Sequence, residues 1–147
     1  MKVLFLDVDG VLNSLEDGYS IDLETEVYWQ RLKKILDATQ AKIVLSSSWR
    51  IGFNPNKDGM SKTLVEKLDA IGAHIHDMTP ILHNADKKRG DEIREWLQQH
   101  PDVDKFAILD DDQDMREYTK THLVKTNTKI GLQDCDVEKA IELLRGE

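Results

Sequence analysis

The chain is poor in cysteine, in long apolar runs and in net positive charge, and each shortage excludes a class of protein. Cys135 is the single cysteine, so neither an internal disulfide nor a cysteine-rich zinc site can form. The apolar run at residues 3–6 has four residues, whereas a membrane helix needs about 20 and a signal peptide also needs a longer stretch. We therefore expect a cytoplasmic protein without membrane contact.

The net charge of −8, from 20 basic and 28 acidic side chains, argues against tight binding to polyanions. An acidic chain lacks the electrostatic footprint of a nucleic-acid or anionic-membrane binder. The chain also lacks a Gly-x-Gly-x-x-Gly motif and a phosphate-loop motif, so nothing supports NAD binding or an ATP-cradling loop. Scattered bases could still supply local positive contacts: Lys33, Lys34, Arg50, Lys57 and Lys62.

Short apolar runs alternate with amphipathic segments along the whole chain. The runs predict strands at residues 3–6, 43–45, 73–75, 106–109 and 123–124. Apolar residues at helical spacing predict helices at residues 28–36, 64–71, 91–100 and 137–144, the third of them beginning after Gly90. Strands that are apolar at every position are buried on both faces, which is typical of a parallel sheet covered by helices on each side.

This alternation predicts a single α/β domain over residues 1–147. We expect a Rossmann-like, three-layer α/β/α fold around a central parallel sheet of about five strands. The polar loops at residues 13–20 and 52–59 are too short to form a separate domain, so no large cap domain is expected.

Acidic and hydroxyl side chains follow three of the predicted strands. Residues 7–10 (Asp-Val-Asp-Gly) follow the first, residues 46–48 (three serines) the second, and residues 110–112 (three aspartates) the fourth. Ligands of open parallel sheets bind beyond the carboxyl ends of the strands, so these groups should meet at one edge. A basic cluster at residues 87–89 opens the helix before the fourth strand and could reach the same edge.

These side chains suit phosphoryl transfer. Asp7 and Asp9 are two residues apart, so in extended backbone their side chains point the same way. One carboxylate can attack phosphorus while the other donates a proton to the leaving oxygen. Crowded carboxylates repel one another, and Mg²⁺ is the usual hard cation that relieves this repulsion near phosphate. A serine hydroxyl and a lysine or arginine would hold the phosphoryl oxygens in the transition state.

Several stretches resemble the signatures of the haloacid-dehalogenase superfamily. Residues 7–13 (Asp-Val-Asp-Gly-Val-Leu-Asn) resemble its first signature, residues 43–46 (Ile-Val-Leu-Ser) its second, and the aspartates at 110–111 its acidic fourth. Residues 45–50 and 89–97 are similar to a small group of cap-less phosphatase domains. That group includes the phosphatase-like domain of bacterial Swiss army knife RNA-repair proteins, and the resemblance covers nearly the whole chain.

The resemblance implies a role for each acidic residue. Asp7 would form a phospho-aspartyl intermediate, and Asp9 would act first as general acid and then as base. Mg²⁺ would be held by Asp7, by the backbone carbonyl of Asp9 and by Asp111, with Asp110 adjacent. Dehalogenases lack an acid at the position of Asp9, and P-type ATPases carry threonine there, so this residue indicates a phosphatase.

Phosphate binding is implied for Ser46, with Ser47 beside it and contributing at least its backbone, and for one base of the third signature. Three consecutive bases at residues 87–89 could fill that last role. Helix register favours Arg89, with Lys88 as the close second.

The implied activity is a Mg²⁺-dependent phosphomonoester hydrolase. A site without a cap can admit a large substrate, and we expect a nucleotide or a terminal nucleic-acid phosphate. Three alternatives stay open: a phosphatase of a phosphoprotein or small metabolite, a binding domain that has lost turnover, and phosphotransfer to an acceptor other than water.

Two further patterns have structural interpretations. His74 and His76 alternate on a predicted strand, but no third metal ligand accompanies them, so we expect surface or partly buried histidines. Trp49 is expected to pack in the core, although both Trp49 and Arg50 follow Ser46 closely enough to line the site.

Overall fold

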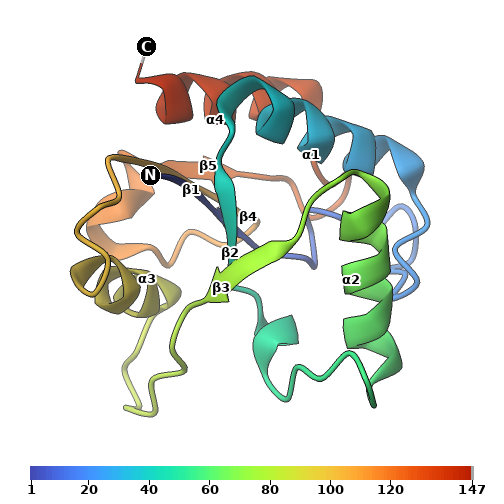
Figure 1. Ribbon diagram of the computed structural model, residues 1–147, viewed down its shortest axis with the longest axis horizontal. Coiled ribbons are helices and arrows are strands. Elements are labelled where there is room, and N and C mark those ends of the chain that lie inside the picture. Colours follow the sequence, from blue (N-terminus) through green and yellow to red (C-terminus); the bar gives the residue numbers. More distant parts are fainter. Residues whose placement is uncertain (147) are drawn as a thin grey trace.

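In the computed structural model, which describes residues 1–146, a parallel sheet carries helices on both faces (Figure 1). Strands β1 to β5 span Lys2–Leu6, Lys42–Leu45, Ile75–Met78, Lys105–Asp110 and Leu123–Lys125. Helices α1 to α4 span Glu26–Thr39, Gly59–Ala70, Arg89–Gln98 and Asp134–Arg145. Two short 3₁₀ helices, η1 and η2, span Ser48–Arg50 and Arg116–Thr119.

The five strands run in the order β3-β2-β1-β4-β5, and every neighbouring pair is parallel. This confirms the predicted α/β fold with a central parallel sheet. The first strand in the chain is central in the sheet, so the strand order reverses beside it. Leu6 of β1 is in register with Leu45 of β2 and with Leu109 of β4. The carboxyl ends of these three strands therefore meet, as the sequence pattern predicted.

The core has one part on each face of the sheet. Leu4 and Leu6 of β1 pack with α1, α2 and α4, whereas Val3 and Phe5 pack with α3. Figure 1 shows α1 beside α4 on one side of the sheet and α3 on the other. Because alternate side chains enter different cores, a central strand must be apolar at every position. Within residues 1–146, none of the helices combines the length and apolar character needed to cross a membrane.

The third strand lies further along the chain than its apolar run predicted. It spans Ile75–Met78 rather than residues 73–75, and it includes the exposed residues His76 and Asp77. The cause is its place at the edge of the sheet, where the strand is covered less completely than a central one. A register shift opposite Ile43 and Val44 further disrupts its alternation.

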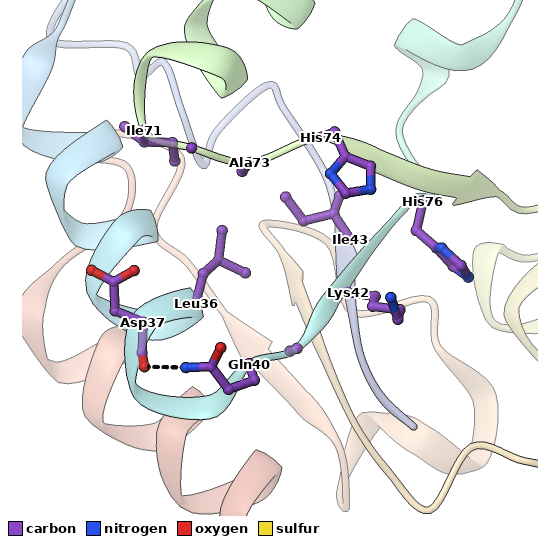
Figure 2. A pocket seen from close by; sticks show the side chains of 11 residues that line it. Leu36, Asp37, Gln40, Lys42, Ile43, Ile71, Ala73, His74 and His76 are labelled. Atoms are coloured by element: carbon purple, nitrogen blue, oxygen red, sulfur yellow. Dashed lines mark hydrogen bonds between the residues drawn. The ribbon is translucent and has the colours of Figure 1, made fainter.

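A pocket of about 240 Å³ lies at the opposite end of the sheet, beside the amino ends of β2 and β3 (Figure 2). The end of α1 and the turn after α2 complete its walls. Its two histidines, His74 and His76, are both exposed. Among residues 1–146, the side chains that could hold a metal as a group of three or more lie elsewhere. Because the pocket lies at the amino ends of the strands, it is remote from the polar residues that follow their carboxyl ends.

Arg50 is buried and joins the turn after β2 to the turn after β3 and to α3. Its guanidinium donates to the backbone carbonyls of Ser46, Ser47, Thr79 and Pro80, and it forms an ion pair with the Glu92 carboxylate at 2.8 Å. These contacts direct the guanidinium toward other parts of the protein. Arg50 therefore has a structural role, and it also lines a hollow together with Ser48 and Arg89.

Replacing Arg50 should destabilise the fold strongly, because Glu92 would stay buried without its guanidinium partner. The two side chains are only 4% and 5% exposed. We expect Arg50→Met to lower the free energy of unfolding by about 3 kcal/mol or more. Lys33→Met is the control, since it breaks an exposed pair with Asp37 worth less than about 1 kcal/mol. Urea unfolding that gives similar losses for both variants would contradict this role.

Candidate active site

Asp7 stands in the middle of a row of polar residues beyond the carboxyl ends of the strands. Its backbone N–H donates to the Leu109 carbonyl at 3.0 Å, which extends the pairing of β1 with β4 by one residue. The N–H of Ser46 donates to the Leu6 carbonyl at 3.1 Å in the same way. Asp7 therefore lies between Ser46 on one side and Asp110, the last residue of β4, on the other.

Three carboxylates meet at this edge. Asp7, Asp110 and Asp111 each place an oxygen within 4.8 Å of the others. Burial raises the pKa of Asp7 well above its usual range, and the charge of Asp110 raises it further. Burial also raises the pKa of Asp110. Hard oxygen donors whose ionisation is disfavoured by burial and repulsion are the kind of group that a divalent cation stabilises.

Arg89 is the cation of the described residues that reaches this cluster most directly. Its Nη1 lies 2.6 Å from Asp110 Oδ2 and 3.3 Å from Asp7 Oδ1. Burial alone would lower the pKa of Arg89, but the two carboxylates outweigh it and the pKa is raised. The guanidinium therefore stays charged beside Asp7.

The neighbouring bases point to other partners. Lys88 Nζ lies 3.7 Å from Asp114, and its side chain is 46% exposed. Lys87 Nζ lies 3.3 Å from Glu92. Of the three bases left open by the sequence, Arg89 is thus the one that the fold brings to the acidic cluster, and Lys88 is not.

The start of α3 explains how Arg89 reaches the cluster. The helix begins at Arg89, two residues earlier than predicted. Gly90 packs so closely that an added Cβ would lie 2.4 Å from a backbone atom of Met115, and its N–H donates to the Asp114 carbonyl at 2.9 Å. Only glycine permits this approach of the helix to the segment after β4. The pattern placed Gly90 before the helix because a glycine usually marks a boundary.

The two predicted phosphate-binding serines differ in their contacts. The Ser46 hydroxyl is buried and has no hydrogen-bond partner among the described residues. Such a group carries a desolvation cost that a phosphoryl oxygen would relieve. The Ser47 hydroxyl instead accepts from the backbone N–H of Trp49 at 3.1 Å and caps η1. A contact from Ser47 to phosphate would therefore use its backbone.

The Asp9 carboxylate lies outside the cluster of three. Its Oδ1 accepts from Asn13 Nδ2 at 2.9 Å, and its Oδ2 accepts from Trp49 Nε1 at 3.1 Å. Trp49 packs in the core, as expected, and also contacts this candidate proton donor. The metal contact predicted for Asp9 involves its backbone carbonyl, so the position of its side chain does not bear on that prediction.

The chain as a whole matches one family model. The family is described as the HAD domain in Swiss Army Knife RNA repair proteins, where HAD stands for haloacid dehalogenase, and its model matches residues 3–137. This chain belongs to that family. No curated protein and no solved structure matched this chain. The family assignment agrees with the α/β fold without a cap and supports a phosphatase-like domain of the HAD type.

Gly10 of this HAD domain leaves room for the Asp111 carboxylate. Its φ is +80°, and an added Cβ would lie 2.1 Å from Asp111 Oδ2. Thr128 Oγ1 donates to the same oxygen at 2.9 Å, and Thr126 Oγ1 donates to the Gly10 carbonyl at 2.8 Å. Sequence reasoning missed both threonines, although they follow β5. Polar residues after the other strands were singled out because ligands bind beyond the carboxyl ends of parallel strands. The same reasoning, applied to β5, would have found both threonines.

Two hollows flank the acidic cluster of the HAD domain. One, of about 250 Å³, is lined by bases and acids together with Ser48 and Ile51: Arg50, Lys87, Lys88, Arg89, Glu92, Asp112 and Asp114. The other, of about 310 Å³, extends from Asp111 along the segment at residues 125–128. Polar groups and lysines thus stand on either side of the cluster.

We expect Gly10→Ala to displace the Asp111 carboxylate and weaken Mg²⁺ binding. In the wild type, excess Mg²⁺ should raise the melting temperature relative to EDTA, because the ion binds the folded state. The variant should lose most of this rise. Gly52→Ala is the matched control, since φ there is +67° but nothing lies within 4 Å. A full Mg²⁺-dependent rise in Gly10→Ala would contradict the prediction.

Proposed function

We propose that this chain acts, as one domain over residues 1–147, as a Mg²⁺-dependent phosphomonoester hydrolase with a phospho-aspartyl intermediate on Asp7. The observation that carries the proposal is the setting of this buried carboxylate. On one side of Asp7 is Ser46, which follows β2 and has an unpartnered hydroxyl. On the other side is Asp110, which pairs with Arg89. This setting supports a site in which a nucleophile, an anion-binding hydroxyl and a fixed cation act on one phosphoryl group.

The acidic cluster fits a magnesium ion. Asp7, Asp110 and Asp111 supply hard oxygen donors within 4.8 Å of one another, and Mg²⁺ binds through such oxygens together with substrate phosphate. The backbone carbonyl of Asp9 would join them. A bound Mg²⁺ neutralises the negative charge that would otherwise keep a phosphate dianion away from a carboxylate.

The side chains can perform a balanced two-step hydrolysis. First, an Asp7 carboxylate oxygen attacks phosphorus and the bond from phosphorus to the leaving oxygen breaks. The leaving oxygen keeps the electron pair and takes a proton from Asp9. A water oxygen then attacks the same phosphorus and gives a proton to Asp9. The bond from phosphorus to Asp7 breaks, so both residues return to their starting states.

Two further side chains would bind the transferred group. The Ser46 hydroxyl would donate to one phosphoryl oxygen, and Arg89 would hold another as charge moves in the transition state. Arg89 already lies 3.3 Å from Asp7, so it needs only a small displacement. Lys88 pairs with Asp114, and we therefore assign the phosphate contact to Arg89.

We propose a nucleotide or a terminal nucleic-acid phosphate as the substrate. The family is named for a domain of RNA repair proteins. No cap domain covers the strand ends within residues 1–146, so a large substrate has access. Lys87 and Lys88 on one side of the cluster and Lys125 on the other could contact neighbouring phosphates. With a net charge of −8, these contacts must be local.

Asp7→Asn should abolish phosphate release from p-nitrophenyl phosphate, with a loss on the order of 10⁴-fold or more, because the nucleophile is removed. The fold should survive. The raised pKa of Asp7 means that its ionised form disfavours the folded state at neutral pH. The melting temperature in EDTA should therefore be equal or higher. The control is Asp112→Asn, an exposed aspartate of the same acidic run. Residual turnover close to wild type would overturn the proposal, and inactivity of the wild type on every phosphoester would favour a binding domain.

The substrate class is tested by comparing kcat/KM across phosphomonoesters. We expect 3′- or 5′-phosphorylated oligonucleotides to exceed mononucleotides, sugar phosphates and phosphopeptides. For the oligonucleotides, kcat/KM should fall only slightly as the salt concentration rises, because only a few lysines can contact phosphates. Equal or better rates on mononucleotides would remove the polynucleotide part of the proposal. Phosphopeptides as the best substrates would remove the nucleotide part as well.

A further inference from the structure

The Asp9 carboxyl group is held by two donors from different parts of the chain. Asn13, in the loop after β1, donates to Oδ1 at 2.9 Å, and Trp49, in η1 after β2, donates to Oδ2 at 3.1 Å. Asn13 is fully buried and Trp49 is 8% exposed. Both oxygens of the carboxyl group are therefore oriented by side chains that are themselves fixed by packing.

Neither donor can accept a proton from Asp9. An indole nitrogen is a donor only. The Asn13 amide is oriented by its other end, because its Oδ1 accepts from the backbone N–H of Gly10 at 2.9 Å. Its Nδ2 must then face Asp9. When Asp9 carries a proton, that proton therefore cannot lie between Asp9 and either of these donors, and it points away from both.

Trp49 also connects Asp9 to the phosphate-binding turn. Its backbone N–H donates at 3.1 Å to the hydroxyl of Ser47, the residue that directly follows Ser46 and caps the start of η1. In the same turn, Arg50 donates to the backbone carbonyls of Ser46 and Ser47. The turn that follows Ser46 thus also orients the candidate proton donor.

We propose that Trp49 is a positioning residue for proton transfer, acting with Asn13 to aim the Asp9 proton at the leaving oxygen. This inference rests on the phosphatase activity proposed above. Asp9 transfers its proton as the bond to the leaving group breaks, and the departing oxygen takes both the electron pair and the proton. A poor leaving group depends strongly on this proton, and a good one hardly at all.

The test compares Trp49→Phe with wild type on an alkyl phosphate and on 2,4-dinitrophenyl phosphate. We expect kcat/KM, which reports the step that breaks the bond to the leaving group, to fall about tenfold or more for the alkyl phosphate and to change little for the dinitrophenyl ester. General damage to the site would lower both rates by the same factor. The matched control is Trp96→Phe, because Trp96 Nε1 donates to Asp77 Oδ2 at 2.8 Å in the same manner. That control should leave the ratio of the two rates unchanged.

Two further variants keep the outcome decisive. β-(3-Benzothienyl)alanine at position 49 keeps the shape of the indole but has sulfur in place of the N–H. It should reproduce the selective loss even if Trp49→Phe folds poorly. In an Asp9→Asn background, Trp49→Phe should cause no further loss on the alkyl phosphate, since it acts through Asp9.

The outcomes separate this inference from the proposed function. If the wild type hydrolyses both esters but the ratio of rates is unchanged by removal of the indole N–H, the positioning role is overturned while the phosphatase stands. An additive loss in the Asp9→Asn background has the same meaning. If the wild type hydrolyses neither ester, the phosphatase and the positioning role fall together.

Discussion

The repulsion among three aspartates at the ends of β1 and β4 is the constraint on which the rest of the site depends. Asp7 and Asp110 are buried, and burial raises both of their pKa values. An arrangement of this kind is costly unless cations and hydrogen bonds offset it. Arg89 offsets part of it through contacts of 2.6 Å and 3.3 Å. In the proposed chemistry, a divalent cation would offset the part of this cost that Arg89 leaves.

The sheet and its turns hold these charges in place. The order β2-β1-β4 puts a hydroxyl and a second acid on either side of the central aspartate. Two glycines allow the close approaches: Gly10 accommodates the Asp111 carboxylate, and Gly90 lets α3 pack against the segment after β4. Arg50 fastens the turn after β2 to α3 through its pair with Glu92. The residues that would contact phosphate are thus held in place by Gly10, Gly90 and Arg50.

Much of this arrangement could be predicted because it follows from burial. Central strands such as residues 3–6 are apolar on both faces, so they can be recognised in the sequence as apolar runs. The acidic residues after these runs mark where the strands end. The edge strand Ile75–Met78 has exposed positions and lacked this signal. The choice of Arg89 over Lys88 depends on how closely α3 packs, and the contacts of Arg50 and Trp49 join segments that are distant in the chain. Spacing along a sequence carries no information on such contacts.

The central claim is that Asp7 takes the phosphoryl group. The most direct measurement is chemical trapping: the protein is quenched during turnover, any acyl phosphate is reduced with borohydride, and the modified residue is located by mass spectrometry. The account predicts conversion of the aspartate at position 7 to homoserine, dependent on both substrate and Mg²⁺. Sustained turnover with position 7 unmodified, or with the modification at Asp9 or Asp110, would contradict it.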